Sequence, residues 1–145
     1  MSSSPSTAGE ADRTWMARCA ELAEQARAAG CTPVGSVIVL DSEVIAEAAE
    51  EVPRGPRAFA HAELLAVEQA LRTTTRDALA RATLYSTAEP CLLCGFAIRE
   101  ARIGRVVIAR PTGEIGSVSS RFPILTTADV TRWGPPPAIV WWPPR

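Results

Sequence analysis

Residues 82–109, ATLYSTAEPCLLCGFAIREARIGRVVIA, predict a strand, a helix and a second strand in direct succession. The flanking runs ATLYST and GRVVIA are short and largely apolar, with several β-branched residues, which favours buried strands. Between them, Pro90 opens the run CLLCGFAIREA, and proline suits the first turn of a helix. This alternation indicates an α/β domain.

The rest of the chain extends the alternation of helices and strands on both sides of this stretch. Apolar residues recur at helical spacing before Gly30, and short apolar runs flank the turn at Asp41 and Ser42. The order predicts a three-layer α/β/α fold with a five-stranded mixed sheet. The other predicted elements are helices over residues 14–29, 60–72 and 126–133 and strands over residues 34–40, 43–48 and 138–142.

The length of 145 residues suits one domain, which we place at residues 14–145. Residues 1–13, MSSSPSTAGEADR, are predicted to form a disordered tail. This stretch has neither the basic flank nor the apolar centre of a secretory signal, and no apolar run approaches the roughly 18 residues of a membrane span. We therefore expect a cytoplasmic protein that does not contact membranes.

The basic residues are spread along the chain. All fifteen are arginines, the formal net charge is −1, and the densest group is REARIGR at residues 99–105. A dedicated nucleic-acid binder usually concentrates its basic residues in a stripe. The distribution of charge therefore predicts no nucleic-acid partner.

The four cysteines divide into two kinds. Because no export signal is seen, disulfides are not expected. Cys91 and Cys94 are three residues apart, which predicts a metal-binding or catalytic pair. Cys19 and Cys31 are predicted to be small buried apolar residues.

The only histidine of the chain, His61, stands at the start of a predicted helix, and Cys91 and Cys94 stand at the start of another. Both helices follow strands of one sheet, so their N-termini can meet at the same edge. Two thiolates and one imidazole suit Zn²⁺ and leave its fourth position to water, as in catalytic zinc sites. The N-terminus of a helix also favours the thiolate form that binds metal.

Glu63 follows His61 by two residues and can lie near a zinc-bound water without being a ligand. Zinc lowers the pKa of such a water to about 7. A carboxylate in that place can take the proton of the water and pass it to a leaving amine. The pattern therefore predicts Glu63 as the catalytic acid and base.

Each motif also has a plainer interpretation. A histidine at a helix start can be a cap, and a CxxC pair can be a redox pair or half of a structural zinc site, completed by Cys19 or Cys31. The combination is more specific, because H-x-E followed by P-C-x-x-C is the signature of zinc deaminases.

The chain resembles the cytidine-deaminase-like superfamily of zinc deaminases, most of all the branch with bacterial tRNA adenosine deaminases and small guanine deaminases. The resemblance runs from about Trp15 to Ala109, in PVGSVIVL, AHAELLAV, TLYSTAEPCLLCGFAI and ARIGRVVIA. It implies zinc ligands at His61, Cys91 and Cys94, a proton-shuttling Glu63 and a homodimer. It also implies hydrolytic replacement of a ring amino group by oxygen, with release of ammonia.

The resemblance also implies substrate contacts. The backbone N–H of Ala62 would contact the reacting ring, and Val34 and the loop before His61, including Phe59, would line the pocket. Glu89, just before Pro90 and Cys91, is a further candidate for substrate binding.

The chain departs from the pattern of purine-acting relatives, which commonly hold the substrate with an asparagine in the loop before HAE. That loop has no asparagine here, and the nearest equivalent is Glu50, or Glu51 with a slip of one residue. A carboxylate accepts hydrogen bonds only, so it would favour a donor-rich substrate edge or a ribose hydroxyl. Alternatively, both glutamates are solvated loop charges.

The C-terminal part also differs, because the basic helical C-terminus of tRNA-editing enzymes is missing. Phe122, Trp133 and Trp141 can wall a pocket by stacking on a base, with Trp133 as the candidate contact, or they can belong to the core.

These features predict a zinc-dependent hydrolase acting on C–N bonds of a small nucleobase, nucleoside or related aminated heterocycle. One alternative is a tRNA-specific adenosine deaminase, which needs a phosphate-binding surface. Another is a non-catalytic, zinc-stabilised binding domain. Glu63 argues against that alternative, because a glutamate that binds no metal is not needed for structure.

Overall fold

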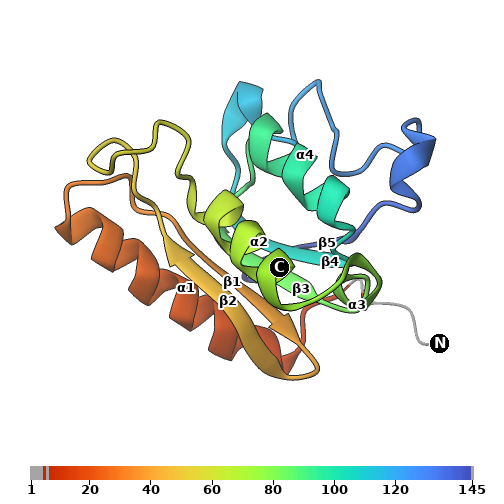
Figure 1. The fold of residues 1–145 in the computed structure, drawn as a ribbon, viewed down its shortest axis with the longest axis horizontal. Coiled ribbons are helices and arrows are strands. Elements are labelled where there is room, and N and C mark those ends of the chain that lie inside the picture. The colour runs from red at the N-terminus through yellow and green to blue at the C-terminus, as the bar shows by residue number, and fades with distance from the viewer. Residues whose placement is uncertain (1–4, 6, 145) are drawn as a thin grey trace.

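The computed structural model describes residue 5 and residues 7–144, and its helices and strands alternate along the chain (Figure 1). The helices are α1 (Glu10–Ala28), α2 (Ala62–Thr73), α3 (Arg76–Leu79) and α4 (Leu92–Ala101). The strands are β1 (Gly35–Leu40), β2 (Glu43–Ala49), β3 (Thr83–Ala88), β4 (Arg105–Arg110) and β5 (Ala138–Trp141). Two 3₁₀ turns, η1 (Gly113–Ile115) and η2 (Thr131–Trp133), lie between β4 and β5.

The five strands form one mixed sheet in the order β2-β1-β3-β4-β5. β1 is antiparallel to β2 and to β3, whereas β3, β4 and β5 are parallel. The predicted hairpin of β1 and β2 turns at Asp41 and Ser42, whose φ angles of 51° and 67° match the left-handed geometry of two-residue hairpins.

Helices cover both faces of the sheet. Side chains of a strand alternate between its faces, so Val37 and Val39 of β1 pack with Met16, Cys19 and Leu22 of α1. Ile38, between them, belongs to the core on the other face with residues of α2 and α4. The three-layer α/β/α fold predicted from the sequence is confirmed.

The first helix begins earlier than predicted. α1 starts at Glu10, so the prediction of a disordered tail does not hold for residues 10–13. Asp12 is buried and accepts hydrogen bonds from the Gly9 N–H, the Tyr85 hydroxyl and the guanidinium of Arg105. These partners anchor the first turn of α1 on β3 and β4. Residues 1–4 and 6 of the predicted tail lie outside the described residues.

The predicted helix over residues 126–133 is reduced to the short turn η2. At the start of this segment and just before it, carbonyls accept hydrogen bonds from a side chain rather than from the backbone of a helix. Arg99 of α4 donates to the carbonyls of Ile124 and Thr127, at 2.8 Å each. A regular helix would have to give up these bonds.

The segments that carry the predicted site meet at one end of the sheet, where β1 begins and β2 and β3 end. The register pairs Gly35 with Ala49 and Ser36 with Ser86, so the start of β1 lies between the ends of β2 and β3. α2 follows β2 after a loop, and α4 follows β3 directly. Both helices therefore begin at this end of the sheet.

The helices of the described residues include none with the length and apolar character needed to cross a bilayer.

Candidate metal centre and active site

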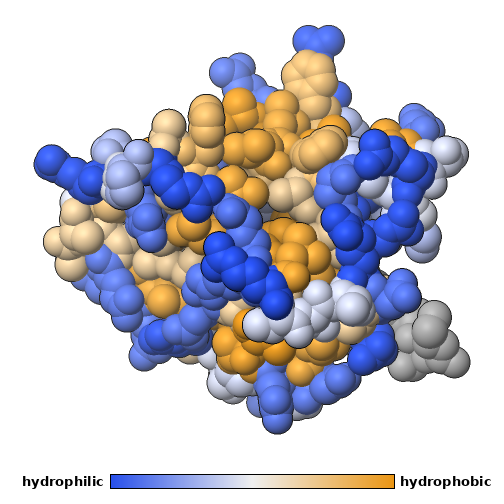
Figure 2. Space-filling model, in the orientation of Figure 1, coloured by the Kyte–Doolittle hydropathy of each residue, from blue (hydrophilic) through white to orange (hydrophobic). Residues whose placement is uncertain are grey.

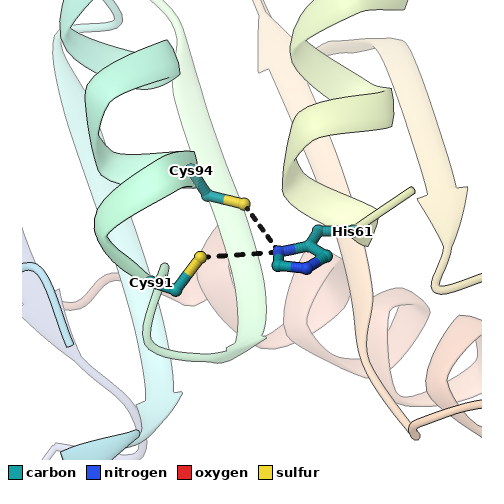
Figure 3. Close-up of side chains that lie close together, drawn as sticks. All are labelled: His61, Cys91 and Cys94. Atoms are coloured by element: carbon teal, nitrogen blue, oxygen red, sulfur yellow. Dashed lines mark hydrogen bonds between the residues drawn. The ribbon is translucent and has the colours of Figure 1, made fainter. Parts of the chain in front are cut away.

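The predicted metal ligands meet between the first turns of α2 and α4 (Figure 3). His61 occupies the N-cap position of α2, Cys91 occupies the N-cap position of α4, and Cys94 lies in the first turn of α4. The sulfur atoms of both cysteines are 3.4 Å from Nδ1 of His61. Within the described part of the chain, this is the one group of three or more such side chains arranged to hold a metal ion.

The spacing of the three donor atoms suits zinc. Tetrahedral zinc has bonds of about 2.3 Å to sulfur and about 2.0–2.1 Å to nitrogen, so sulfur and nitrogen ligands lie about 3.5 Å apart. The observed 3.4 Å agrees with this value. Three protein ligands leave one position for water or substrate, which is typical of a catalytic zinc.

The helix termini explain why these side chains are free to bind metal. Neither His61 nor Cys91 caps its own helix with its side chain. The pKa of Cys91 is lowered to about 5, chiefly because the Cys94 thiol donates a hydrogen bond to its sulfur, and the Cys94 N–H and His61 add to the effect. That bond and burial raise the pKa of Cys94. A thiolate ligand is thus present before metal binding releases the second proton.

Glu63 is buried in the first turn of α2. Burial raises its pKa to about 8, although hydrogen bonds from its own N–H and from Ser86 oppose the shift. A carboxyl group with such a pKa can exchange protons near neutral pH. Ser86 was not among the predicted site residues, and its only signal in the sequence is a hydroxyl in a largely apolar strand.

Glu50 is not a solvated loop charge. It is buried, and its Oε1 accepts the backbone N–H of Ala62 at 2.7 Å. Burial raises the pKa of Glu50, while the Ala62 N–H and His61 lower it. Glu50 thus caps α2 from the end of β2, and the Ala62 N–H that was predicted to contact substrate already has an acceptor. Glu51 is exposed.

Glu89 holds a loop in place rather than facing an open pocket. It is 1% exposed, and its carboxylate accepts hydrogen bonds from Thr112 N–H, Val118 N–H, and the N–H and hydroxyl of Ser119, at 2.6–3.0 Å. The predicted role of Glu89 in substrate binding does not agree with this placement. The loop that Glu89 holds, residues 112–119, instead contacts the metal site through an isolated β-bridge between Gly116 and Cys91.

Two other predicted contacts lie close to the metal ligands. Val34 packs with Ala62 and Ala88 in a small buried cluster. Phe59 is 65% exposed, and its carbonyl accepts the His61 N–H at 2.8 Å. Val34 is thus buried against the first residue of α2, and Phe59 contacts His61 through its backbone; their roles in binding substrate remain predictions.

The structure does not bring Trp133 to the metal ligands. Its ring packs edge-on against Phe96, with 5.6 Å between centroids, and its indole N–H donates to Glu100 at 2.7 Å. Phe96 lies about 200° around α4 from Cys94. Trp133 is buried there, whereas Phe122 and Trp141 remain exposed. Cys19 and Cys31 are buried, as predicted.

Comparison with known proteins relates this site to zinc deaminases. The family model of the cytidine and deoxycytidylate deaminase zinc-binding region matches residues 9–110. The tRNA-specific adenosine deaminase of Aquifex aeolicus is 37% identical over 103 residues, which are 71% of this chain and 68% of that protein. Among such curated relatives, the matched share of their own length ranges from 53% to 68%.

Solved structures show the same fold. A structure from a study of A-to-I editing by tRNA:A34 deaminases has a TM-score of 0.77 and 28% identity, covering 89% of this chain and 97% of that chain. A guanine deaminase from Bacillus subtilis has a TM-score of 0.62 and 35% identity, covering 68% of this chain and 64% of that chain.

One prediction is wrong in the light of these relatives. The scattered arginines and the net charge of −1 predicted no nucleic-acid partner. The relatives that match, however, are enzymes named for their action on tRNA. Net charge describes the whole chain and does not report how arginines gather on the folded surface.

The zinc cofactor and the class of hydrolase acting on C–N bonds are confirmed by the family match and by the three converging ligands. The chain therefore belongs to the family of the cytidine and deoxycytidylate deaminase zinc-binding region.

Proposed function

We propose that this chain hydrolyses the amino group of adenosine within a tRNA, which converts adenosine to inosine. The observation that carries the reaction is buried Glu63, in the first turn of the helix that presents His61 to the two cysteines. The tRNA-specific adenosine deaminases among the relatives support the substrate.

The reaction forms a bond between water oxygen and C6 of adenine and breaks the bond from C6 to the amino nitrogen, which leaves as ammonia. His61, Cys91 and Cys94 would hold a zinc ion, which would supply a water of lowered pKa. Glu63 takes a proton from the attacking water and delivers it to the departing nitrogen, so one residue acts first as base and then as acid.

A second candidate is a free purine base of the guanine type. The structural likeness to a guanine deaminase supports it, and so does Glu50. Because a carboxylate only accepts hydrogen bonds, Glu50 suits a ring edge that carries N–H donors, as guanine does.

The test incubates zinc-loaded protein with a tRNA transcript, its anticodon stem-loop, adenosine and guanine, and measures inosine, xanthine and ammonia. Glu63→Gln is the control, since it retains the ligands and should lose about 10²- to 10⁴-fold in turnover. Inosine in the RNA that disappears with this variant supports the proposal. Xanthine from guanine, without inosine, would favour the second candidate.

We further propose that the chain forms a homodimer, as the resemblance implies, and that it acts in the cytoplasm, as the lack of a secretory signal in residues 1–13 suggested. Light scattering of the purified protein tests the dimer by its mass, and a monomer at micromolar concentration contradicts it.

A further inference from the structure

Arginines that are far apart in the sequence gather at the C-terminal end of α4. We call Arg76, Arg81, Arg99, Arg102 and Arg132 the α4 arginine cluster; they come from α3, the turn before β3, α4 itself and η2. Figure 2 shows hydrophilic side chains gathered over this end of α4 and the loop that carries η2, on the right of the view. The face shown is the one that bears α2 and α4 (Figure 1).

Hydrogen bonds link three members of the α4 arginine cluster, Arg76, Arg102 and Arg132, directly or through Glu100. Arg76 donates to the backbone carbonyl of Glu100 at 2.8 Å, and Arg132 lies 3.1 Å from the Glu100 carboxylate. Arg102 donates to the carbonyl of Arg132 at 2.7 Å. Arg81, Arg99 and Arg102 also line one cavity of about 790 Å³.

The α4 arginine cluster carries more positive than negative charge. Three carboxylates pair with it or line the cavity: Glu100 with Arg132, Asp41 at 3.4 Å from Arg81, and Asp77. Five arginines therefore meet three carboxylates. Within residues 5 and 7–144, neither Arg99 nor Arg102 has a carboxylate within 4.0 Å. Arg105, which also lines the cavity, is neutralised by Asp12.

Backbone contacts hold Arg99 and Arg102 in place, and of these two only the exposed Arg102 has donors that face solvent. Arg99 is buried, donates to the carbonyls of Ile124, Thr127 and Gly134, and lies 4.8 Å from the centroid of the Trp133 ring, so it supports the cluster from the interior. Arg102 is exposed, and the side chain of Arg132 is 73% exposed. A guanidinium has five N–H donors and matches the geometry of a phosphate group. An ordered pair of such groups loses little entropy when an anion binds.

We propose that the α4 arginine cluster binds the phosphodiester backbone of the RNA substrate, an inference that rests on the proposed function. Cys91 and Arg102 lie at opposite ends of α4, about 16 Å apart at 1.5 Å per residue. This span equals about five stacked nucleotides at roughly 3.4 Å each. The cluster therefore contacts phosphates about five nucleotides from the base that enters the metal site.

The experiment measures binding of a fluorescent anticodon stem-loop to the zinc-loaded chain by anisotropy at several salt concentrations. The variants are Arg102→Gln and Arg132→Gln. The matched control is Arg27→Gln, an exposed arginine on α1, which covers the opposite face of the sheet. Removing one arginine that binds a phosphate should reduce the slope of log K against log salt by about 0.7–0.9. The control should leave this slope unchanged.

A second measurement locates the phosphate that the cluster binds. Replacing single phosphates by uncharged methylphosphonates should weaken binding to the wild type about five nucleotides from the target adenosine. The same replacement should have no effect on binding to the Arg102→Gln variant.

The outcomes separate this inference from the proposed function, because inosine is measured in the same samples. If the wild type forms inosine and both variants bind the stem-loop as the wild type does, the proposed phosphate binding by the cluster is refuted and the proposed function stands. Binding that falls in both variants without any inosine supports the cluster and refutes the function. A wild-type chain that does not bind the stem-loop overturns the cluster as well.

Discussion

The buried ion pair between Asp12 and Arg105 should make a measurable contribution to the free energy of unfolding. Both side chains are buried, and two of their N–H···O contacts are 2.9 and 2.8 Å long. The Tyr85 hydroxyl donates to the same carboxylate at 2.6 Å. Replacing Asp12 by Asn removes the charge, keeps the shape and leaves Arg105 buried without a counter-ion. Breaking a buried pair in this way typically costs about 3–5 kcal/mol.

The pKa of Asp12 gives the part of this energy that depends on pH. Burial alone would raise this pKa, but the hydrogen bonds from Arg105, Tyr85 and the Gly9 N–H outweigh it and lower the pKa from 3.8 to about 2. One pKa unit corresponds to about 1.36 kcal/mol, so the shift is worth about 2 kcal/mol. Because the folded-state pKa is depressed, this stability is present above pH 3.8 and disappears as the pH falls toward 2.

Urea unfolding of the wild type and of Asp12→Asn between pH 7 and pH 2.5 tests the reasoning. The difference in free energy of unfolding should be constant above about pH 4 and shrink below it. The difference between the two proteins cancels acid effects that they share, such as loss of zinc. Glu24→Gln, which breaks an exposed pair with Arg27 on α1, is the control. A difference below about 1 kcal/mol at pH 7, or one that does not change with pH, would refute the argument.

Three further predictions concern the site and its supports. Cys94→Ala should reduce bound zinc, measured by metal analysis, from about one ion per chain to nearly none. If the variant keeps its zinc, Cys94 is not a ligand. Glu50→Ala should lower the free energy of unfolding by about 1–2 kcal/mol in urea, because the buried Ala62 N–H loses its acceptor, while Glu50→Gln keeps most of it. Gly116→Ala should cost about 1–3 kcal/mol in the same assay, since a Cβ there would overlap the Glu89 carboxylate; wild-type stability would contradict that packing.

Local patterns predicted most of the secondary structure. The strands β1, β2, β3 and β4 begin and end within about one residue of their predicted bounds, because alternation and β-branched runs are local signals. The start of α1 was missed, since Asp12 is stabilised by Arg105, which is 93 residues away. The prediction for residues 126–133 fails for the same kind of reason, because the Thr127 carbonyl accepts a hydrogen bond from Arg99, 28 residues away.

Polar partners were harder to predict than the metal ligands. The spacing of HAE and PCLLC placed the three ligands correctly at the starts of two helices. Nothing in the local sequence distinguishes a glutamate that caps a distant helix, such as Glu50, from a solvated one. The donors that hold Glu89 lie in residues 112–119, after another helix and strand, so its local sequence does not predict these hydrogen bonds.

By itself, the sequence determined the order of helices and strands, the α/β class and the trio of His61, Cys91 and Cys94. These features follow from the periodicity of neighbouring residues and from short motifs at helix starts. Only the tertiary structure decided which charged groups meet: Asp12 with Arg105, Glu50 with the start of α2, and the arginines at the end of α4. The physical reason is that burial and electrostatic interactions depend on distance in space, and each of these groups finds its partners across the fold.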